Sequence, residues 1–497
     1  QVLEHNKITD YDKLFVSCIY RKTKHEGGAL FSAVLEEIQA DAKDVLHIGN
    51  DAKADILRSK AIGLDSYLIK PPSRKSYVNE SKAKDNLDYS LLYGFITKYN
   101  SPQTPESLAY RLGFDVFGPI AKGFMEWIKD HKDRHNLDAI LFLARDGYVL
   151  QAISNQEGEL RSFYSYLSRR SVVIPLIQYR QSLEDILRLY KSWQPNITLT
   201  TLFNRLGIPY DADVVHSVGL RESDTFSRDE LTQDERIQAL YNQVKAKVYY
   251  NSQEQGQLLS DYLKQYKDYR RIGVVDLGAG TIVSALQQYS TIKNYNIDWI
   301  PLYLQNSHEP TDSYINVSQN YELQTALRLG YMFLEVFFTA PHGTTLGYEY
   351  NENCEAIPLL EDYEYSSIPE DYKNRLAELH QGAMDFYQFY PLDMMQYGSI
   401  DADLVMTNFI QFVLHPDDED VAYWGPYPVY IDSFEPMVKN KSLVAYLINP
   451  KQLVTDFKDS IWPAGFLHAL GNSNLLLGML NHSNQLRLSL KDKLVKR

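Results

Sequence analysis

The chain has 497 residues, of which 44% are hydrophobic and 23% are charged, so it is long enough for two or three globular domains. Its formal net charge of −14 argues against a general nucleic-acid-binding protein, because such proteins are more often basic. Two cysteines, Cys18 and Cys354, are too few for a disulfide framework and favour a reducing, cytoplasmic compartment.

The sequence shows no stretch long and apolar enough to span a bilayer, and no signal peptide at its start. It begins with Gln1, which suggests a processed chain or a fragment of a longer polypeptide. The basic end, 491–497, has three interpretations: a solvated terminus, a cut linker or a contact with a membrane surface.

Residues 1–75 alternate between strand-like and helix-like patterns, and the βαβαβ order is typical of a parallel sheet. Gly63 is a plausible end for the second helix. Strands are predicted at 13–18, 44–51 and 65–72, and helices at 27–40 and 52–63.

The remainder divides into a helix and linker (76–110), a second α/β region (111–355) and a mainly helical region (356–497). Two strand–turn–helix units in the α/β region carry short glycine-containing turns. Helices are predicted at 119–135 and 369–390, the strand–turn–helix units at 139–153 and 271–286, and a further strand at 298–305.

The first region places four polar residues after predicted strands, where ligands bind in parallel sheets. Ser17 and Lys24 can hold a phosphate, and Asp51 and Asp55 can hold Mg²⁺ through carboxylate oxygens. Taken singly, Asp51 is equally well explained as the cap of the following helix, and Lys24 as a solvated side chain.

The "ARDG" turn (144–147) of the second region is suited to a phosphate. Arg145 can bind phosphate oxygens with its forked guanidinium, and Gly147 permits a tight turn before the next helix. An internal salt bridge between Arg145 and Asp146 is an equally good interpretation of the pair. Arg169 and Arg170 add positive charge nearby in the sequence "LSRRS".

The "DLGAGT" turn (276–281) forms a second candidate anion site. Thr281 can bond a phosphate together with the backbone at Gly278 and Gly280, and Asp276 can bind ribose hydroxyls or a metal ion. Such a turn is also compatible with a Rossmann-like scaffold in which the glycines serve packing only.

Two further residues are candidates for a general base. Glu335 lies among apolar residues, so its carboxyl is expected to have a raised pKa, although it can equally be a hydrogen-bonded core residue. His342 stands in a loop between Pro341 and Gly343, where a lone histidine is more often structural.

The order of Ser17, Lys24, Asp51 and Asp55 resembles the second, third and fourth motifs of the haloacid dehalogenase (HAD) phosphatase superfamily. The resemblance implies a partial HAD-like Rossmannoid module, with Asp51 and Asp55 as metal ligands. One departure matters: the nucleophilic aspartate of that family follows an apolar first strand, and nothing before Ser17 provides it. As written, the module is not expected to turn over alone.

The central region is similar to type I phosphoribosyltransferases, in which one loop holds the 5-phosphate of phosphoribosyl diphosphate (PRPP) and another holds its diphosphate. Their fingerprint usually has two adjacent acids, whereas here Asp276 is followed by Leu277. The motifs together resemble a bacterial family of surface-polysaccharide loci that joins a HAD-type phosphatase to a phosphoribosyltransferase-like module. The ribosyl modules of the Haemophilus type b capsule polymerase are of this sort.

The resemblance implies an enzyme that transfers a phosphoribosyl group from PRPP, with Mg²⁺, to a glycan hydroxyl and then removes the 5-phosphate. Arg145, Arg169 and Arg170 are expected at the leaving diphosphate, and Glu335, Asp146 or His342 as the base. The resemblance leaves three points open: peripheral contact with the inner face of the membrane, further domains of a longer polymerase, and an oligomeric state. Two alternatives remain: a HAD-type phosphatase without transferase activity, and a non-catalytic glycan-binding subunit.

Overall fold

The computed structural model describes residues 9–69, 76–99, 107–190, 196–278, 280–305, 312–316, 320–390, 400–431, 433–439, 441 and 443–471. The chain forms two compact units, Gln1–Lys75 and Ser76–Arg497. The expected segments 76–110, 111–355 and 356–497 therefore all fall within the second unit. The basic end at 491–497 and most of the predicted linker lie outside the described residues. In the described part of the chain, no helix has the length and apolarity that crossing a membrane requires.

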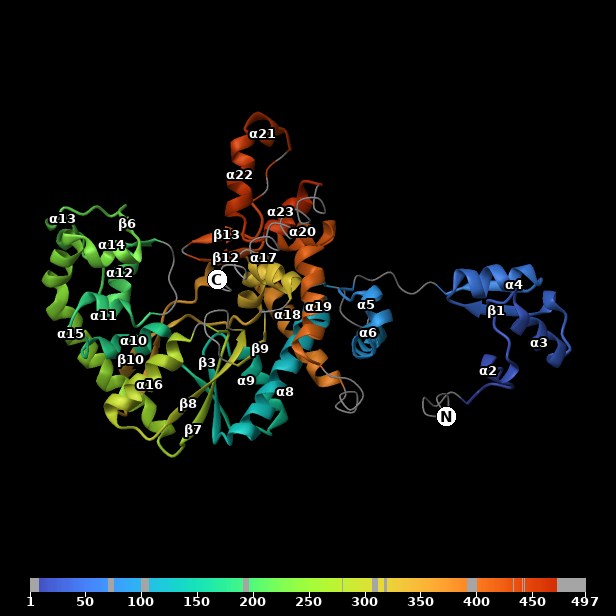
Figure 1. Ribbon diagram of the computed structural model, residues 1–497, viewed down its shortest axis with the longest axis horizontal. Coiled ribbons are helices and arrows are strands. Elements are labelled where there is room, and N and C mark those ends of the chain that lie inside the picture. Colours follow the sequence, from blue (N-terminus) through green and yellow to red (C-terminus); the bar gives the residue numbers. More distant parts are fainter. Residues whose placement is uncertain are drawn as a thin grey trace, which may run out of the picture. The chain divides into compact units, whose positions relative to one another are not determined.

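The first unit contains a two-stranded parallel sheet in which Leu46 pairs with Asp65 and Gly49 with Leu68. Helices connect and flank these two strands (Figure 1). The elements are α2 (Ser17–Tyr20), α3 (Ala29–Ile38), η1 (Ala42–Asp44), β1 (Leu46–Gly49), η2 (Ala52–Leu57), α4 (Arg58–Ala61) and β2 (Asp65–Leu68).

The strand predicted at 13–18 is wrong. Ser17 begins the short helix α2 and is exposed, and Val16 before it has extended backbone that pairs with no other strand among the described residues. A run of three apolar residues, 14–16, fits a strand and a helical turn equally well, because neither period repeats within it. The other predicted strands and helices of this unit are present as β1, β2, α3 and the pair η2–α4.

The second unit is built on a five-stranded, wholly parallel sheet with the order β4-β3-β7-β8-β9. Three of its strands, β3, β7 and β9, are buried for most of their length, as expected for a sheet covered on both faces. The strands are β3 (Ala139–Leu143), β4 (Ser162–Ser165), β7 (Arg271–Asp276), β8 (Asp298–Gln305) and β9 (Ser313–Ile315).

Alternate residues of β3 and of β8 enter two different hydrophobic cores, because side chains along a strand point to opposite faces. Ile140 and Phe142 of β3 belong to one core, whereas Leu141 and Leu143 belong to the other. The first face is covered by α8 (Gly118–His135), α9 (Tyr148–Glu157) and α17 (Tyr321–Phe337). The second is covered by α10 (Arg169–Ile177), α15 (Glu235–Leu263) and α16 (Thr281–Lys293).

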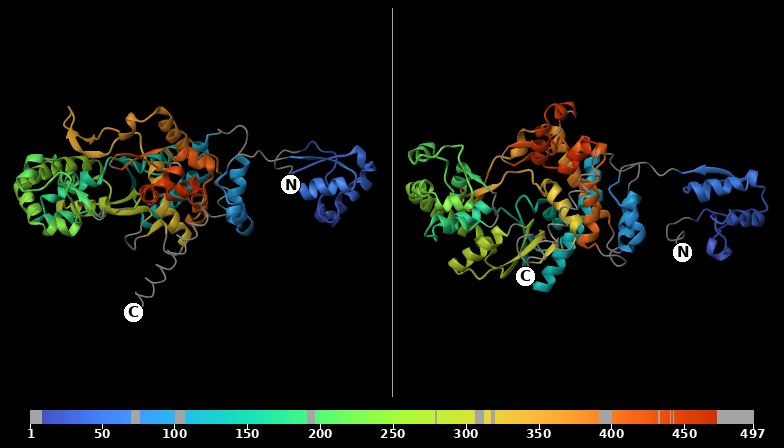
Figure 2. Two further views of the ribbon diagram at one scale, coloured as in Figure 1. Left: turned by 90° about the horizontal axis from the view of Figure 1, so that it is seen from above. Right: turned by 45° about the horizontal axis from the view of Figure 1, so that its top comes forward.

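Between β4 and β7 the chain inserts a mostly helical segment, which gathers at one side of the second unit (green in Figures 1 and 2). Its elements after α10 and before α15 are α11 (Leu183–Leu187), β5 (Ile197–Thr198), α12 (Leu199–Leu206), α13 (Ala212–Ser217), β6 (Thr225–Phe226) and α14 (Arg228–Gln233). The turn η4 (Lys264–Tyr266) follows α15.

The helices before β3 and after β9 share one hydrophobic core, so the C-terminal helices pack on the start of this unit, whereas Tyr348 of β10 belongs to the other core. Before β3 these are α5 (Glu80–Asp85), α6 (Leu87–Tyr99), α7 (Leu108–Leu112) and η3 (Gly113–Phe117). After α17 they are β10 (Thr345–Tyr350), β11 (Ala356–Leu360), η5 (Glu364–Ser367), α18 (Glu370–Phe389), α19 (Ala402–Leu414), α20 (Asp418–Trp424), β12 (Pro428–Tyr430), β13 (Phe434–Pro436), α21 (Leu443–Ile448), α22 (Pro450–Asp459) and α23 (Pro463–Ala469).

Candidate functional site

The strand order creates a place for a ligand at the carboxyl ends of β3 and β7. After β3 the chain passes through α9 to β4 on one side, whereas after β7 it passes through α16 to β8 on the other. In open parallel sheets, ligands bind in the crevice where successive connections diverge in this way. Both predicted phosphate turns, "ARDG" and "DLGAGT", follow these two strands.

A cavity of about 550 Å³ lies at this point. Seven residues predicted from the sequence are brought together in its wall, although they are far apart in the chain. They are Arg145, Asp146, Arg169, Asp276, Gly278, Thr281 and Glu335.

The turn after β3 holds Arg145 in an unusual backbone conformation. Its φ is 74°, in the left-handed region that residues with a side chain rarely adopt. Gly147 closes the turn, and a Cβ there would come within 2.8 Å of the carbonyl oxygen of Leu143. The Arg145 guanidinium donates to Thr344 Oγ1 at 2.6 Å and also pairs with Glu364. The predicted alternative, a salt bridge to Asp146, is therefore not the ion pair that Arg145 forms.

Three carboxyl groups line the cavity, each from a different element. Asp276 ends β7, is 7% exposed and accepts a hydrogen bond from Gly278 N at 3.3 Å. Asp146 is half-buried after β3. Glu335, in the last turns of α17, is exposed towards the cavity.

The protein around these groups favours their protonated forms. Burial, and then the charges of Asp276 and Glu335, raise the pKa of Asp146 to about 8. Burial also raises the pKa of Asp276. Desolvation by the surrounding protein also raises the pKa of Glu335, and the positive charges of Arg169 and Arg145 oppose this rise. This agrees with the direction expected for Glu335 from its apolar sequence neighbours.

The charges of the cavity are suited to an anion that arrives with a cation. Glu364 adds a fourth carboxylate, so the acids in the wall outnumber Arg145 and Arg169. In the described part of the chain, no group of three His, Cys, Asp or Glu side chains is arranged as a complete metal site. Mg²⁺ commonly takes only one or two protein carboxylates and completes its shell with phosphate oxygens and water. The residues present fit that mode of binding.

Three helices begin at this edge of the sheet, and their first N–H groups are suited to anions. The helix α9 begins after Gly147, α10 after Ser168 and α16 after Gly280. The Ser168 side chain already accepts from Ser171 N, whereas α9 and α16 have no side-chain cap. Gly278 and Gly280 have φ values of 142° and 69°, which explains why the turn after β7 uses glycine.

Four predicted residues do not line the cavity: Gly147, Arg170, Gly280 and His342. Gly147 and Gly280 shape the turns. The Arg170 Nε is buried and has no hydrogen-bond partner in the described part of the chain. Both ring nitrogens of His342 are engaged: Nε2 with the Tyr164 hydroxyl at 2.7 Å and Nδ1 with the Gly343 carbonyl at 2.9 Å.

The sequence did not single out several residues of the cavity. Tyr331 had a usable signal, because it precedes Glu335 by four residues and so shares its face of α17. Thr344 and Glu364 carry no such local sign, since they reach the cavity from segments that follow α17. The other lining residues are Leu143, Ala144, Leu167, Ser168, Leu277, Ile282, Thr339, Thr345, Tyr430 and Ile431.

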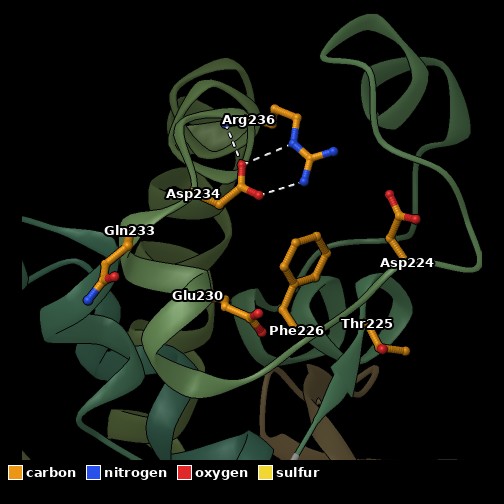
Figure 3. Close-up of a pocket in the computed structure, with 7 residues that line it drawn as sticks. All are labelled: Asp224, Thr225, Phe226, Glu230, Gln233, Asp234 and Arg236. Carbon is orange, nitrogen blue, oxygen red and sulfur yellow. Dashed lines mark hydrogen bonds and ion pairs between the residues drawn. The ribbon is translucent and has the colours of Figure 1, made fainter.

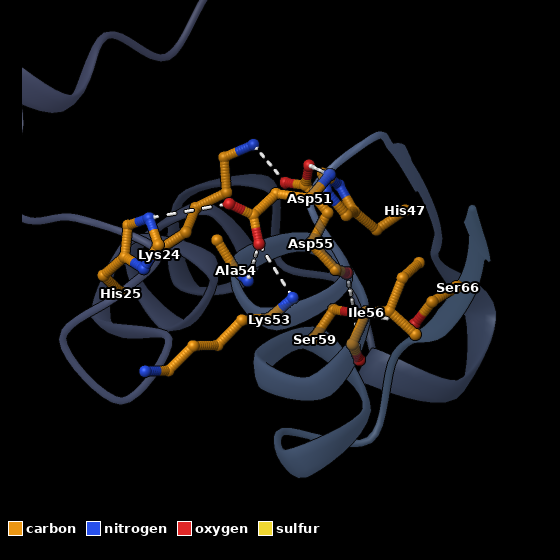
Figure 4. Close-up of polar contacts among 10 residues, drawn as sticks. All are labelled: Lys24, His25, His47, Asp51, Lys53, Ala54, Asp55, Ile56, Ser59 and Ser66. Atoms are coloured by element: carbon orange, nitrogen blue, oxygen red, sulfur yellow. Dashed lines mark hydrogen bonds and ion pairs between the residues drawn. The ribbon is translucent and has the colours of Figure 1, made fainter. Parts of the chain in front are cut away.

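The first unit brings three of its four predicted residues together (Figure 4). The Lys24 ammonium lies 2.6 Å from Oδ1 of Asp55, a residue that is only 3% exposed. The same oxygen lies 3.0 Å from His47 Nε2, and Asp51 N donates to the other oxygen at 2.9 Å. Gly49 permits this approach, since a Cβ there would come 2.2 Å from Asp55 Cγ.

Asp51 serves as a helix cap, as one interpretation of the sequence predicted. Its Oδ1 accepts from Lys53 N and Ala54 N, both at 2.7 Å, and these bonds lower its pKa. Lys24 is an ion-pair partner and not simply a solvated side chain. Ser17 lies exposed at the start of the helix α2, so its predicted position at a strand end is wrong.

A further cavity, of about 440 Å³, lies in the helical insertion (Figure 3). Its acidic side chains already have partners: Asp234 pairs with Arg236, and Glu230 accepts from Ser227. Asp224, a third acidic residue of this wall, accepts from Arg221 N, and none of the site residues predicted from the sequence lines this cavity.

Among known proteins, no family model and no curated protein sequence matches this chain. The assignment of a function therefore depends on the residues of the cavity at β3 and β7.

Proposed function

We propose that the second unit transfers a phosphoribosyl group from PRPP to a hydroxyl of a glycan. The observation that carries this proposal is the meeting of two arginines and three carboxyl groups in one cavity, at the point where the sheet connections diverge. PRPP carries a phosphate at one end and a diphosphate at the other, and the cavity is bordered by two separate glycine-containing turns. We propose accordingly that the α/β region of the second unit is a phosphoribosyltransferase-like domain.

The diphosphate would lie against Arg145 and Arg169, which stabilise the charge that develops as it leaves. Arg145 would exchange its bond with Glu364 for phosphate oxygens. The turn at Gly278 and Thr281 would hold the 5-phosphate through N–H groups at the start of α16. When bound, Mg²⁺ would neutralise the diphosphate, with Asp276 and Asp146 as its protein ligands.

Glu335 is our choice for the general base. It is exposed towards the cavity, and its raised pKa makes it a better proton acceptor than an ordinary carboxylate. It would take the proton of the acceptor hydroxyl as that oxygen attacks C1 of the ribose, and the diphosphate leaves from the opposite face with inversion. His342 is disfavoured in this role because both of its ring nitrogens are engaged outside the cavity.

A second function, removal of the 5-phosphate, is favoured for the first unit by the contact of Lys24 with buried Asp55. The arrangement is suited to a phosphate and Mg²⁺, as the resemblance to HAD phosphatases implies. The family's nucleophilic aspartate follows a strand, and the described part of this unit has no strand before β1. We therefore expect phosphate binding here without rapid turnover by this unit alone.

The test is isothermal titration of the chain with PRPP and Mg²⁺, using Asp276→Asn and Arg145→Ala. Matched controls are Asp298→Asn and Arg271→Ala, which alter the same residue types at the amino ends of β8 and β7, the opposite edge of the sheet. We expect micromolar binding that falls at least about thirtyfold in the first pair only.

Binding of a nucleotide sugar in place of PRPP would overturn the phosphoribosyl assignment. An equal loss in the control pair would show that the effect is one of folding. Release of phosphate from a phosphorylated sugar without any binding of PRPP would leave the phosphatase alternative.

A further inference from the structure

The segment 342–345, which leads from the loop after α17 into the first residue of β10, contacts both arginine-bearing turns of the cavity. Its His342 bonds to Tyr164 and its Thr344 to the Arg145 guanidinium. The carbonyl of Thr345 accepts from the Ser168 hydroxyl at 2.6 Å, next to Arg169. We call residues 342–345 the clamp segment.

The left-handed backbone of Arg145 needs support, because this conformation is costly for a residue with a side chain. Arg145 N donates to the Tyr164 hydroxyl at 2.8 Å. That hydroxyl in turn lies 2.7 Å from His342 Nε2. Because the Gly343 carbonyl can only accept, His342 Nδ1 carries the proton of the neutral ring, and Nε2 then accepts from the Tyr164 hydroxyl.

The far side of the clamp segment is fixed by close packing. A Cβ at Gly343 would lie 1.9 Å from the carbonyl oxygen of Glu361, so no larger residue fits without moving the segment. Glu361 N also donates to the Thr344 carbonyl at 2.9 Å. The segment is thus held against residue 361 on one side and against the arginine turns on the other.

We propose that Tyr164 and His342 are positioning residues that act through Arg145, and that the clamp segment sets the spacing of the two arginines for a diphosphate. This inference rests on the proposed function, because it assumes that Arg145 binds the leaving group. It assigns His342 a role outside proton transfer. Neither Tyr164 nor His342 lines the cavity, so neither would touch the substrate.

The test compares Tyr164→Phe with Tyr166→Phe, by titration with PRPP and Mg²⁺. Tyr166 is the matched control, because its ring also packs near His342, with centroids 5.5 Å apart, but its hydroxyl takes no part in the bonds to Arg145. We expect Tyr164→Phe to weaken binding about tenfold and Tyr166→Phe to change it less than about twofold.

A double-mutant cycle separates positioning from a general loss of structure. If Tyr164 acts through Arg145, then Tyr164→Phe should have no further effect on affinity when Arg145 is already alanine. His342→Ala should match Tyr164→Phe, and His342→Gln, whose amide oxygen can accept the tyrosine proton, should restore part of the affinity.

The two proposals fail in different ways. If the wild-type chain does not bind PRPP, the proposed function falls and takes the inference with it. If the wild type binds and Arg145→Ala does not, but Tyr164→Phe and His342→Ala bind like the wild type, only the positioning inference is wrong. Additive losses in the double mutant would also overturn it.

Discussion

Replacing Asp146 by asparagine removes one of three neighbouring carboxyl groups and should stabilise the second unit, increasingly as the pH rises. The pKa of Asp146 is about 8 in the folded chain, whereas an unfolded aspartate has a pKa of about 3.9. Between these values the unfolded chain releases a proton that the folded chain keeps. The wild type therefore loses stability as the pH rises from about 4 to about 8, and the variant does not.

The size of the effect follows from the pKa difference. Each pH unit inside this window is worth at most about 1.4 kcal/mol, so the advantage of Asp146→Asn could grow by about 4 kcal/mol between pH 5 and pH 8. Because Asp146 is only half-buried and keeps part of its hydration, we expect about 2 kcal/mol.

Urea unfolding followed by tryptophan fluorescence measures this change in the right part of the molecule. All five tryptophans lie after residue 76, so the signal reports on the second unit alone. Asp133→Asn, at a side chain that is 80% exposed, is the control and should show no comparable pH-dependent gain. An advantage of Asp146→Asn that is the same at pH 5 and pH 8 would refute the reasoning.

Three other substitutions test separate parts of the structure. Lys24→Met removes a partner of buried Asp55 and should destabilise the first unit by about 1–2 kcal/mol, seen as faster amide hydrogen exchange of β1 and β2; unchanged exchange would contradict the pairing. Burial lowers the pKa of His380 to about 4, so the folded chain takes up this proton less readily than the unfolded chain. The free energy of unfolding of the wild type should therefore fall by up to about 3 kcal/mol between pH 6.5 and pH 4. In the same urea assay, His380→Gln should not show this loss. Trp462→Ala should cost about 3–5 kcal/mol, because this side chain is fully buried; a melting temperature within a degree or so of the wild type would show that the packing is wrong.

The sequence predicted three of the five strands of the second unit's sheet, β3, β7 and β8, because these carry strong local patterns, but it did not single out β4 or β9. The strand at 298–305 has the predicted bounds, and the units at 139–153 and 271–286 correspond to β3–α9 and β7–α16, whose helices run on to Glu157 and Lys293. The same reasoning failed at 13–18, where the apolar run is too short to show a period. The strands β3, β7 and β8 have longer nonpolar runs than 14–16, and β3 and β7 are each followed by a glycine-containing turn.

The sequence predicted those residues of the candidate site that lie at the ends of buried strands. Arg145 and Asp276 follow buried strands, so their meeting at one sheet edge follows from parallel pairing. Glu364 and Tyr430 reach the cavity through long-range packing of segments that carry no motif. The sequence offered His342 as a candidate base, whereas its hydrogen bonds depend on Tyr164, far away in the chain, and could not be predicted from its own loop.

The pairing of Ala139 with Ile272 has a consequence for biosynthesis. The two central strands are separated by the whole helical insertion, so a ribosome working at about 5–20 residues per second needs on the order of ten seconds between them. During that interval β3 can pair with β4, to which α9 connects it, but the edge of β3 that pairs with β7 stays open. The cavity, which needs Asp276, can form only after β7 has emerged, so an arrested or truncated chain would contain the first arginine turn and no site.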